Sequence, residues 1–163
     1  MSQEPKRDDT KTECGIDAPL TTDRLTPHQT NALSIMRCYF LSYTNPRSCA
    51  WELGMETAVR AYGSERGPNV AWACLKCVQE MRVSRKTTFN FCNPFCKCCR
   101  QRLTQHEQYL VESIDHASQG AVGSLSLTAM MLCEGNENFG FIDSLYGLNE
   151  VMASKATRTQ FVG

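Results

Sequence analysis

The chain has 163 residues, 42% of them hydrophobic, and its 17 basic and 17 acidic residues sum to a formal net charge of zero. This length and composition are enough for one modest hydrophobic core. Because the apolar runs are short, we expect no transmembrane helix. The first 15 residues carry both signs of charge and no apolar run, so we expect no secretory signal of ordinary form.

Ten cysteines in a chain without such a signal indicate a reducing compartment. In that environment clustered thiols bind metal more often than they form disulfides. We therefore expect a cytoplasmic protein, or a nuclear one if the source is eukaryotic.

The zero net charge hides an uneven distribution of charge along the chain. Residues 74–106 carry a net charge of +6, whereas residues 107–163 carry −5. Because the cationic stretch is also the stretch richest in cysteine, its charge predicts more about function than the total does.

The first two parts of the chain read as an arm and a helical hairpin. Residues 1–24 are polar and aperiodic, which predicts a flexible arm. Within residues 25–66, Thr26-Pro27 marks a helix start, and apolar residues at helical spacing continue to Thr44. Asn45-Pro46 begins a second helix that ends at Gly63 as its C-cap.

The third part, residues 67–118, contains the cysteine-rich segment and a long helix. The apolar run at residues 69–73 is too short for its periodicity to distinguish a helix from a strand. Residues 78–91 favour a β-hairpin whose second arm is Thr87–Phe91, although the first arm can also extend a helix. From Pro94 to Ser118 the pattern is that of one amphipathic helix. The fourth part, residues 119–163, predicts acidic helices at about 124–133 and 139–152.

Four cysteines, Cys74, Cys77, Cys96 and Cys99, are spaced C-x2-C-x18-C-x2-C, as in tetrahedral structural zinc sites. A turn at the first pair, a hairpin, and the second pair at a helix start would form a treble-clef-like zinc module. The predicted fold class is therefore mainly α, with a helical body and this module at its centre. The ligand set stays open, because Cys92, Cys98 and His106 are alternative ligands.

The cysteine spacing resembles that of GATA-type zinc fingers over about 26 residues. The segment between the two pairs, VQEMRVSRKTTFNFCNPF, lacks that family's aromatic-Arg-Arg core, so no function is transferred. Two other interpretations remain: an iron–sulfur cluster held by four thiolates, and free cysteines buried in a helical core.

The local positive charge predicts contact with nucleic acid, DNA in particular, through phosphates. Phe89 and Phe91 add aromatic rings that can stack on bases if they are exposed. The competing interpretation is that the same cations pair with the acidic C-terminal helices. The predicted phosphate contacts are Arg82, Arg85, Lys86, Lys97, Arg100 and Arg102.

Catalysis is not expected, because the chain has three histidines and no nucleophile elbow, phosphate loop or HExxH motif. A small-molecule substrate and a membrane partner are not expected either. The sequence favours a zinc-containing, DNA-binding or transcription-associated regulatory protein that also contacts a protein through its helices. The alternative is a protein–protein adaptor or assembly subunit braced by a purely structural zinc site, and a third possibility is an iron–sulfur or redox protein.

Overall fold

The computed structural model of the protein describes residues 15–155. Its first long helix, α1 (Pro27–Thr44), begins where the sequence predicts. The Thr26 side chain accepts the backbone N–H of Gln29, and the Gln29 side chain accepts the backbone N–H of Thr26. This capping box satisfies two N–H groups that the helix itself leaves without partners. Pro27 follows as the first helical residue, so the predicted helix is confirmed.

The second helix, α2 (Ala50–Ser84), is bent sharply at Gly63, which adopts φ of 85° and ψ of 168°. Only glycine adopts such a conformation easily. A Cβ at Gly67 would lie 2.5 Å from the Cα of Val59, so the chain folds back closely after the bend. Gly63 therefore ends the first helical half, as predicted, but a second half replaces the predicted loop.

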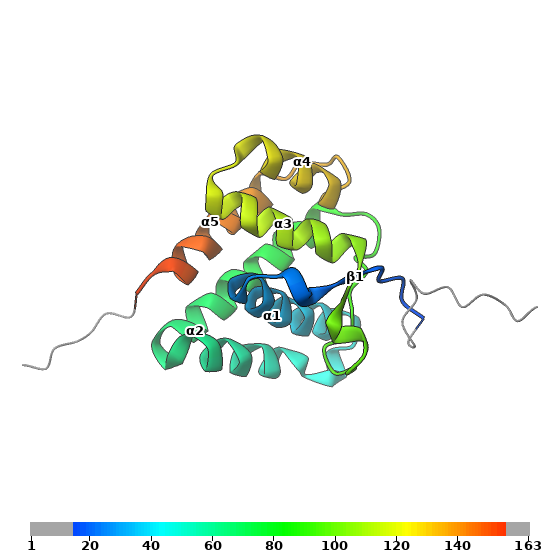
Figure 1. Ribbon diagram of the computed structural model, residues 1–163, viewed down its shortest axis with the longest axis vertical. Helices are drawn as coiled ribbons and strands as arrows, with labels where there is room; N and C mark the ends of the chain where they lie inside the picture. The colour runs from blue at the N-terminus through cyan, green and yellow to red at the C-terminus, as the bar shows by residue number, and fades with distance from the viewer. Residues whose placement is uncertain (1–14, 156–163) are drawn as a thin grey trace, which may run out of the picture.

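The second half of α2 lies between α1 and α5 in the centre of the molecule (Figure 1). Its buried residues recur at helical spacing and belong to the main core. The prediction of a β-hairpin over residues 78–91 is therefore wrong, since 85–98 contain no strand, whereas the alternative for its first arm is confirmed, because 78–84 extend the helix. The buried positions of this half are Gly67, Val70, Ala71, Cys74, Cys77, Val78 and Met81.

Three shorter helices complete the body: α3 (Gln105–Gln119), α4 (Val122–Leu132) and α5 (Phe139–Ala153). Thr104 and Glu107 form a second capping box, so α3 begins eleven residues later than the predicted start at Pro94. The two C-terminal helices are confirmed. Residues of all five helices α1–α5 contribute to one main core.

A small sheet ties residues before α1 to residues before α3. Strands β1 (Leu20–Thr21) and β2 (Arg102–Leu103) pair antiparallel, with Leu20 opposite Leu103. The 3-10 turn η1 (Thr22–Arg24) follows β1 and lies against η3 (Cys99–Gln101). A third turn, η2 (Pro46–Ser48), joins α1 to α2.

The predicted arm at residues 1–24 is therefore ordered in its last part, whereas residues 1–14 lie outside the described residues. The mainly helical class is confirmed, but the region described has no hairpin-plus-helix module around the cysteines. None of the described helices combines the length and apolar character that crossing a bilayer requires.

Candidate metal centre

The segment between α2 and α3 carries four of the ten cysteines in one loop, residues 92–101, here called the cysteine loop. Cys92 and Cys99 are fully buried and pack with Ala18, and Cys96 packs against them. This side cluster is separate from the main core. The loop is thus a second, smaller packing unit on the helical body.

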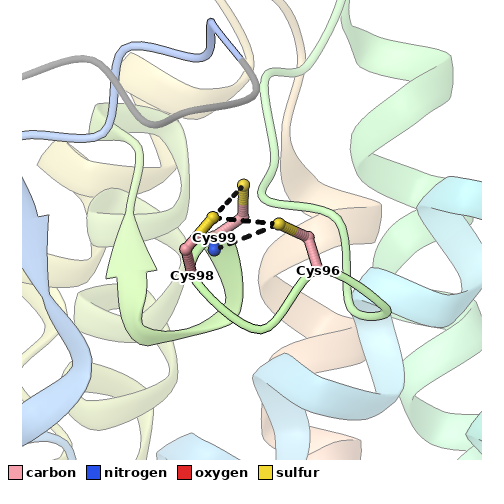
Figure 2. Close-up of side chains that lie close together, drawn as sticks. All are labelled: Cys96, Cys98 and Cys99. Atoms are coloured by element: carbon pink, nitrogen blue, oxygen red, sulfur yellow. Dashed lines mark hydrogen bonds between the residues drawn. The ribbon is translucent and has the colours of Figure 1, made fainter.

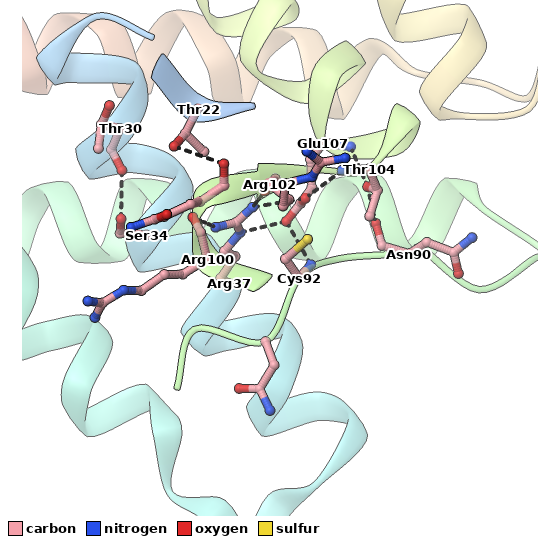
Figure 3. Close-up of polar contacts among 12 residues, drawn as sticks. Thr22, Thr30, Ser34, Arg37, Asn90, Cys92, Arg100, Arg102, Thr104 and Glu107 are labelled. Atoms are coloured by element: carbon pink, nitrogen blue, oxygen red, sulfur yellow. Dashed lines mark hydrogen bonds and ion pairs between the residues drawn. The ribbon is translucent and has the colours of Figure 1, made fainter. Parts of the chain in front are cut away.

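A buried ion pair between α1 and α3 holds the C-terminal end of the cysteine loop (Figure 3). The guanidinium of Arg37 donates from Nε to Glu107 Oε1 at 2.6 Å and from Nη2 to Oε2 at 3.0 Å. The same guanidinium donates to the carbonyl oxygens of Arg100 and Arg102 at 2.9 and 2.6 Å. Arg37 is 3% exposed and Glu107 0% exposed, so both charges depend on these partners.

The carboxylate of Glu107 also holds the N-terminal end of the loop. Its Oε1 accepts the backbone N–H of Cys92 at 3.0 Å, and its Oε2 accepts that of Thr104 at 3.0 Å. The Thr104 hydroxyl donates to the carbonyl of Asn90 at 2.7 Å. Both ends of the cysteine loop are therefore anchored to α3 and α1 by one network of protein groups.

Three sulfurs of this loop converge (Figure 2): Cys96, Cys98 and Cys99, here called the sulfur group, have their Sγ atoms within 4.8 Å of one another. The Cys96–Cys98 and Cys98–Cys99 Sγ distances are 3.1 and 3.8 Å. Thiolates about 2.3 Å from one zinc ion in a tetrahedron lie about 3.8 Å apart. The Cys98–Cys99 pair already has that separation, and the Cys96–Cys98 pair would have to open slightly.

The local backbone favours this convergence. A turn at Asn93 brings the chain back, with the N–H of Cys96 bonded to the Asn93 carbonyl at 3.1 Å. The N–H of Cys99 then points at the sulfur of Cys96, 3.5 Å away. An N–H directed at sulfur stabilises a thiolate and lowers its electron density when it binds metal. The C-x2-C pair at 96–99 thus forms a turn in which a backbone N–H is directed at a cysteine sulfur, and Cys98 lies within that turn.

Thiol acidity in this loop is set by the neighbouring thiols. The hydrogen bond with Cys96, together with desolvation and the nearness of Cys99, raises the pKa of Cys98 to about 11. Burial, followed by the charge of Glu107, raises the pKa of Cys92 to about 12. A bound cation has the opposite effect, because it stabilises each thiolate directly.

The structure does not bring the four predicted zinc ligands together. Cys74 and Cys77 lie on the buried side of α2 and belong to the main core, whereas Cys96 and Cys99 belong to the side cluster. Burial raises the pKa of Cys77 to about 12 and that of Cys74 well above its ordinary value. For this first pair, the arrangement matches the interpretation as buried free cysteines.

The alternative ligands have different positions. Cys98 is part of the sulfur group, and Cys92 shares its side cluster without entering the group. His106 is outside the group: its Nδ1 accepts the N–H of Asn90 at 2.9 Å, and its ring packs on Phe89. Burial, and then the charge of Arg85, lowers the pKa of His106.

The six predicted phosphate contacts fall into two classes. Arg85 is 4% exposed at its side chain and pairs with Glu134 at 3.3 Å, and Arg102 donates to the Ala18 carbonyl at 2.8 Å. Both are engaged within the fold. Arg82, Lys86, Lys97 and Arg100 are exposed, and Lys97 and Arg100 flank the sulfur group.

The Arg37–Glu107 pair is the part of the site that the sequence analysis missed. Thr104-x-x-Glu107 is a capping-box sequence, so it could have placed the start of α3. No local signal marks Arg37, because an arginine on an apolar helix face normally extends to solvent.

Comparisons with protein-family models, with curated proteins and with solved structures give no match for this chain. Inferences about its function therefore depend on the geometry described above.

Proposed function

We propose that this chain is a zinc-binding regulatory protein in which the cysteine loop holds the ion. The observation that carries the proposal is the convergence of Cys96, Cys98 and Cys99 in one loop, with their sulfurs within 4.8 Å. Cys92 would supply the fourth thiolate, since it already packs in the same side cluster. Soft thiolates favour zinc, copper(I) or iron–sulfur clusters, and four cysteines form a common structural zinc set.

The ion would order the loop rather than the whole protein. This is supported by the main core, which contains none of the four proposed ligands, and by the Arg37–Glu107 network, which anchors both loop ends through protein groups. Metal binding would therefore fix the segment between these anchors. A local change of this kind is suited to regulation, because it alters one surface while the body stays folded.

That surface is basic, which supports nucleic acid as the regulated partner. Lys97 and Arg100 are exposed on either side of Cys98, and in the ordered loop they would contact phosphates. Arg82, in the last turn of α2, and Lys86, two residues after its end, are the other exposed members of the predicted set.

A protein–protein adaptor with a structural zinc site is the second candidate. It is favoured by two observations: Arg85 and Arg102 are engaged within the fold, and Trp51 and Trp72 are 50% and 61% exposed. Exposed tryptophans are typical of protein interfaces.

Metal analysis of the purified chain tests the zinc site. We expect about one zinc ion per chain, and Cys98→Ser should lose most of it. Cys49→Ser is the matched control, because Cys49 is also an exposed free cysteine but lies outside the sulfur group. A brown protein containing iron and sulfide, or equal zinc in the two variants, would contradict the proposal.

Nucleic-acid binding is tested separately, by titrating random-sequence duplex DNA at several salt concentrations. Lys97→Ala with Arg100→Ala should weaken binding and reduce the salt slope by about one for each phosphate interaction removed. The control is Arg60→Ala, an exposed arginine that pairs with Glu56 on α2. Undetectable binding of the unaltered, zinc-loaded protein at low salt would favour the adaptor.

A further inference from the structure

The outward side of the second half of α2 is an exposed ridge. Grooves lie along both of its flanks, one toward α1 and the other toward α5. Trp72, Lys76 and Val83 are exposed along the ridge, with Trp72 and Val83 61% and 81% exposed. We call this ridge and its two flanks the α2 face. Trp72 and Val83 are two large apolar side chains on one exposed side of the helix, with the polar Lys76 between them, and we consider this side as an interaction surface.

The flank toward α1 is apolar and ends in a positive charge. Its groove is a cavity of about 300 Å³ whose lining contains no charged residue. The hydroxyl of Ser42 already accepts the backbone N–H of Trp51 at 2.7 Å, and the hydroxyl of Tyr39 donates to the Ala71 carbonyl at 3.0 Å. The groove is therefore suited to an apolar side chain rather than a polar base edge. Its lining residues are Tyr39, Ser42, Tyr43, Trp51, Met55, Trp72 and Leu75.

Arg82 provides the charge at this flank. Its guanidinium lies 3.5 Å from the ring centroid of Tyr43, the residue shared by this groove and a neighbouring cavity next to Phe40. Among the residues the structure describes, Arg82 forms no ion pair. An occupant that places a carboxylate beside an apolar group would satisfy both features.

The opposite flank, toward α5, has the complementary character. Phe139, at the start of α5, is 77% exposed. Glu137 and Asp143 are exposed on either side of it in the sequence. The cavities along this flank are lined by residues of α2, including Trp72 and Glu80, and by Gly140 of α5. Both flanks therefore border the same ridge.

We infer that two copies of this chain associate through the α2 face, around a two-fold axis parallel to the second half of α2. Rotation about such an axis exchanges the two flanks, so the α5 flank of each copy lies over the α1 flank of the other. Phe139 of each copy then enters the apolar groove beside Tyr43, and Glu137 pairs with Arg82. The closed two-fold arrangement satisfies both sites of both copies.

By composition, residues 156–163 and 1–14 of the same chain fit this occupant less well. Residues 156–163 contain Phe161 and Val162 but no acidic residue, and they include Arg158. Residues 1–14 contain acidic residues, but their only large apolar residue is Met1. Exposed aromatic rings with exposed carboxylates on either side in the sequence are found at Phe139 and Tyr146, and Phe139 is the more exposed of the two, 77% against 37%.

Sedimentation equilibrium of the full chain over a concentration series tests the association. We expect a mass of twice 18.3 kDa at high concentration. Phe139→Ser should raise the dissociation constant about tenfold or more, as loss of a buried aromatic anchor does. Val122→Ser is the matched control, because Val122 is 68% exposed on α4, away from the α2 face. A monomer at every concentration, or equal effects of the two variants, would overturn the inference.

A charge exchange tests the arrangement. Arg82→Glu and Glu137→Arg should each weaken the dimer, because each places like charges opposite one another, and the double variant should restore it. A double variant weaker than both single variants would overturn the predicted pairing, and a mass that keeps growing with concentration would overturn the closed two-fold arrangement. Circular dichroism confirms that each variant is folded. Zinc content is expected to stay unchanged throughout, so failure here is distinguishable from failure of the metal site.

Discussion

The two CxxC pairs of this chain are chemically similar, but the fold places them in different environments. Cys74 and Cys77 are three residues apart on one buried face of α2, where both thiols fill core volume. Cys96 and Cys99 are also three residues apart, but in a turn where an N–H points at sulfur and a third thiol lies alongside. Spacing alone does not distinguish these cases, because i and i+3 share a face of a helix as well as a turn.

Alanine substitutions at one residue of each pair should separate the two roles. Cys77→Ala should keep the zinc and lower the free energy of unfolding by about 1–2 kcal/mol, since it removes a buried sulfur from the core. Cys99→Ala should lose the zinc. Denaturant unfolding and metal analysis of both variants provide the measurements. Loss of zinc from Cys77→Ala at unchanged stability would restore the ligand set predicted from the sequence.

A second prediction concerns the contribution of the Arg37–Glu107 pair to stability. Glu107→Gln removes one charge and leaves Arg37 buried without its counter-ion, so we expect a loss of about 3–5 kcal/mol in unfolding free energy. Glu112→Gln, on the same helix but only half-buried, is the control and should cost well under 1 kcal/mol. A loss equal to that of the control would show that the pair does not anchor the loop.

At the scale of elements, the bounds of α1, α4 and α5 follow from the sequence, whereas the start of α3 and the extent of the central helix do not. Thr26-Pro27 and the C-terminal periodicity fixed the starts and ends of α1, α4 and α5 to within a few residues. The sequence leaves residues 78–83 open between a hairpin arm and the extension of a helix, because the cysteines interrupt the apolar pattern when they are counted as metal ligands. Counted as apolar residues, Cys74 and Cys77 continue the helical spacing from Val70 to Met81. The conformation of the cysteine loop could not be predicted from the local sequence, because its position depends on the long-range Arg37–Glu107 contact.

The connection after α2 depends on Glu134 and makes that element sensitive to acid. The Glu134 carboxylate accepts the backbone N–H groups of Lys86 and Thr87 and the Thr87 hydroxyl, and it pairs with Arg85. The hydrogen bond from Thr87, then that from Lys86, lowers the pKa of Glu134 from 4.5 to about 2. In that range the unfolded chain binds the proton more readily, so the stabilisation present above pH 4.5 is lost as the pH falls toward 2.

Replacing this carboxylate should remove its contribution to the acid response. Glu134→Gln should be less stable than the unaltered protein at neutral pH, and the difference should shrink as the pH falls from 4.5 toward 2. Thermal unfolding across this range is the measurement. Glu150→Gln, an exposed glutamate on α5, serves as control and should not change the profile. A constant difference at every pH would show that Glu134 acts through packing rather than charge.

On the scale of the whole molecule, the protein consists of one helical core and a small cysteine cluster beside it. The core draws on all five helices, whereas the cluster contains Ala18, Cys92 and Cys99, with Ile16 and Cys96 against it. In small zinc modules the bound ion takes the place of a hydrophobic core, and the chain unfolds when the ion is removed. Here the core exists independently of the proposed ligands, so metal loss should act on the cluster and leave the body intact.

Chelation of the zinc-loaded protein tests this division of the molecule. The far-ultraviolet circular dichroism should keep its helical signal, and unfolding should remain cooperative. Amide hydrogen exchange should instead rise in residues 93–99, where the ion would hold the chain between its anchors, with little change in α1 and the second half of α2. The unloaded Cys98→Ser variant is the control, because the chelator should not alter its exchange. Collapse of the helical signal on chelation would mean that the ion supports the main core, as in the zinc module predicted from the sequence.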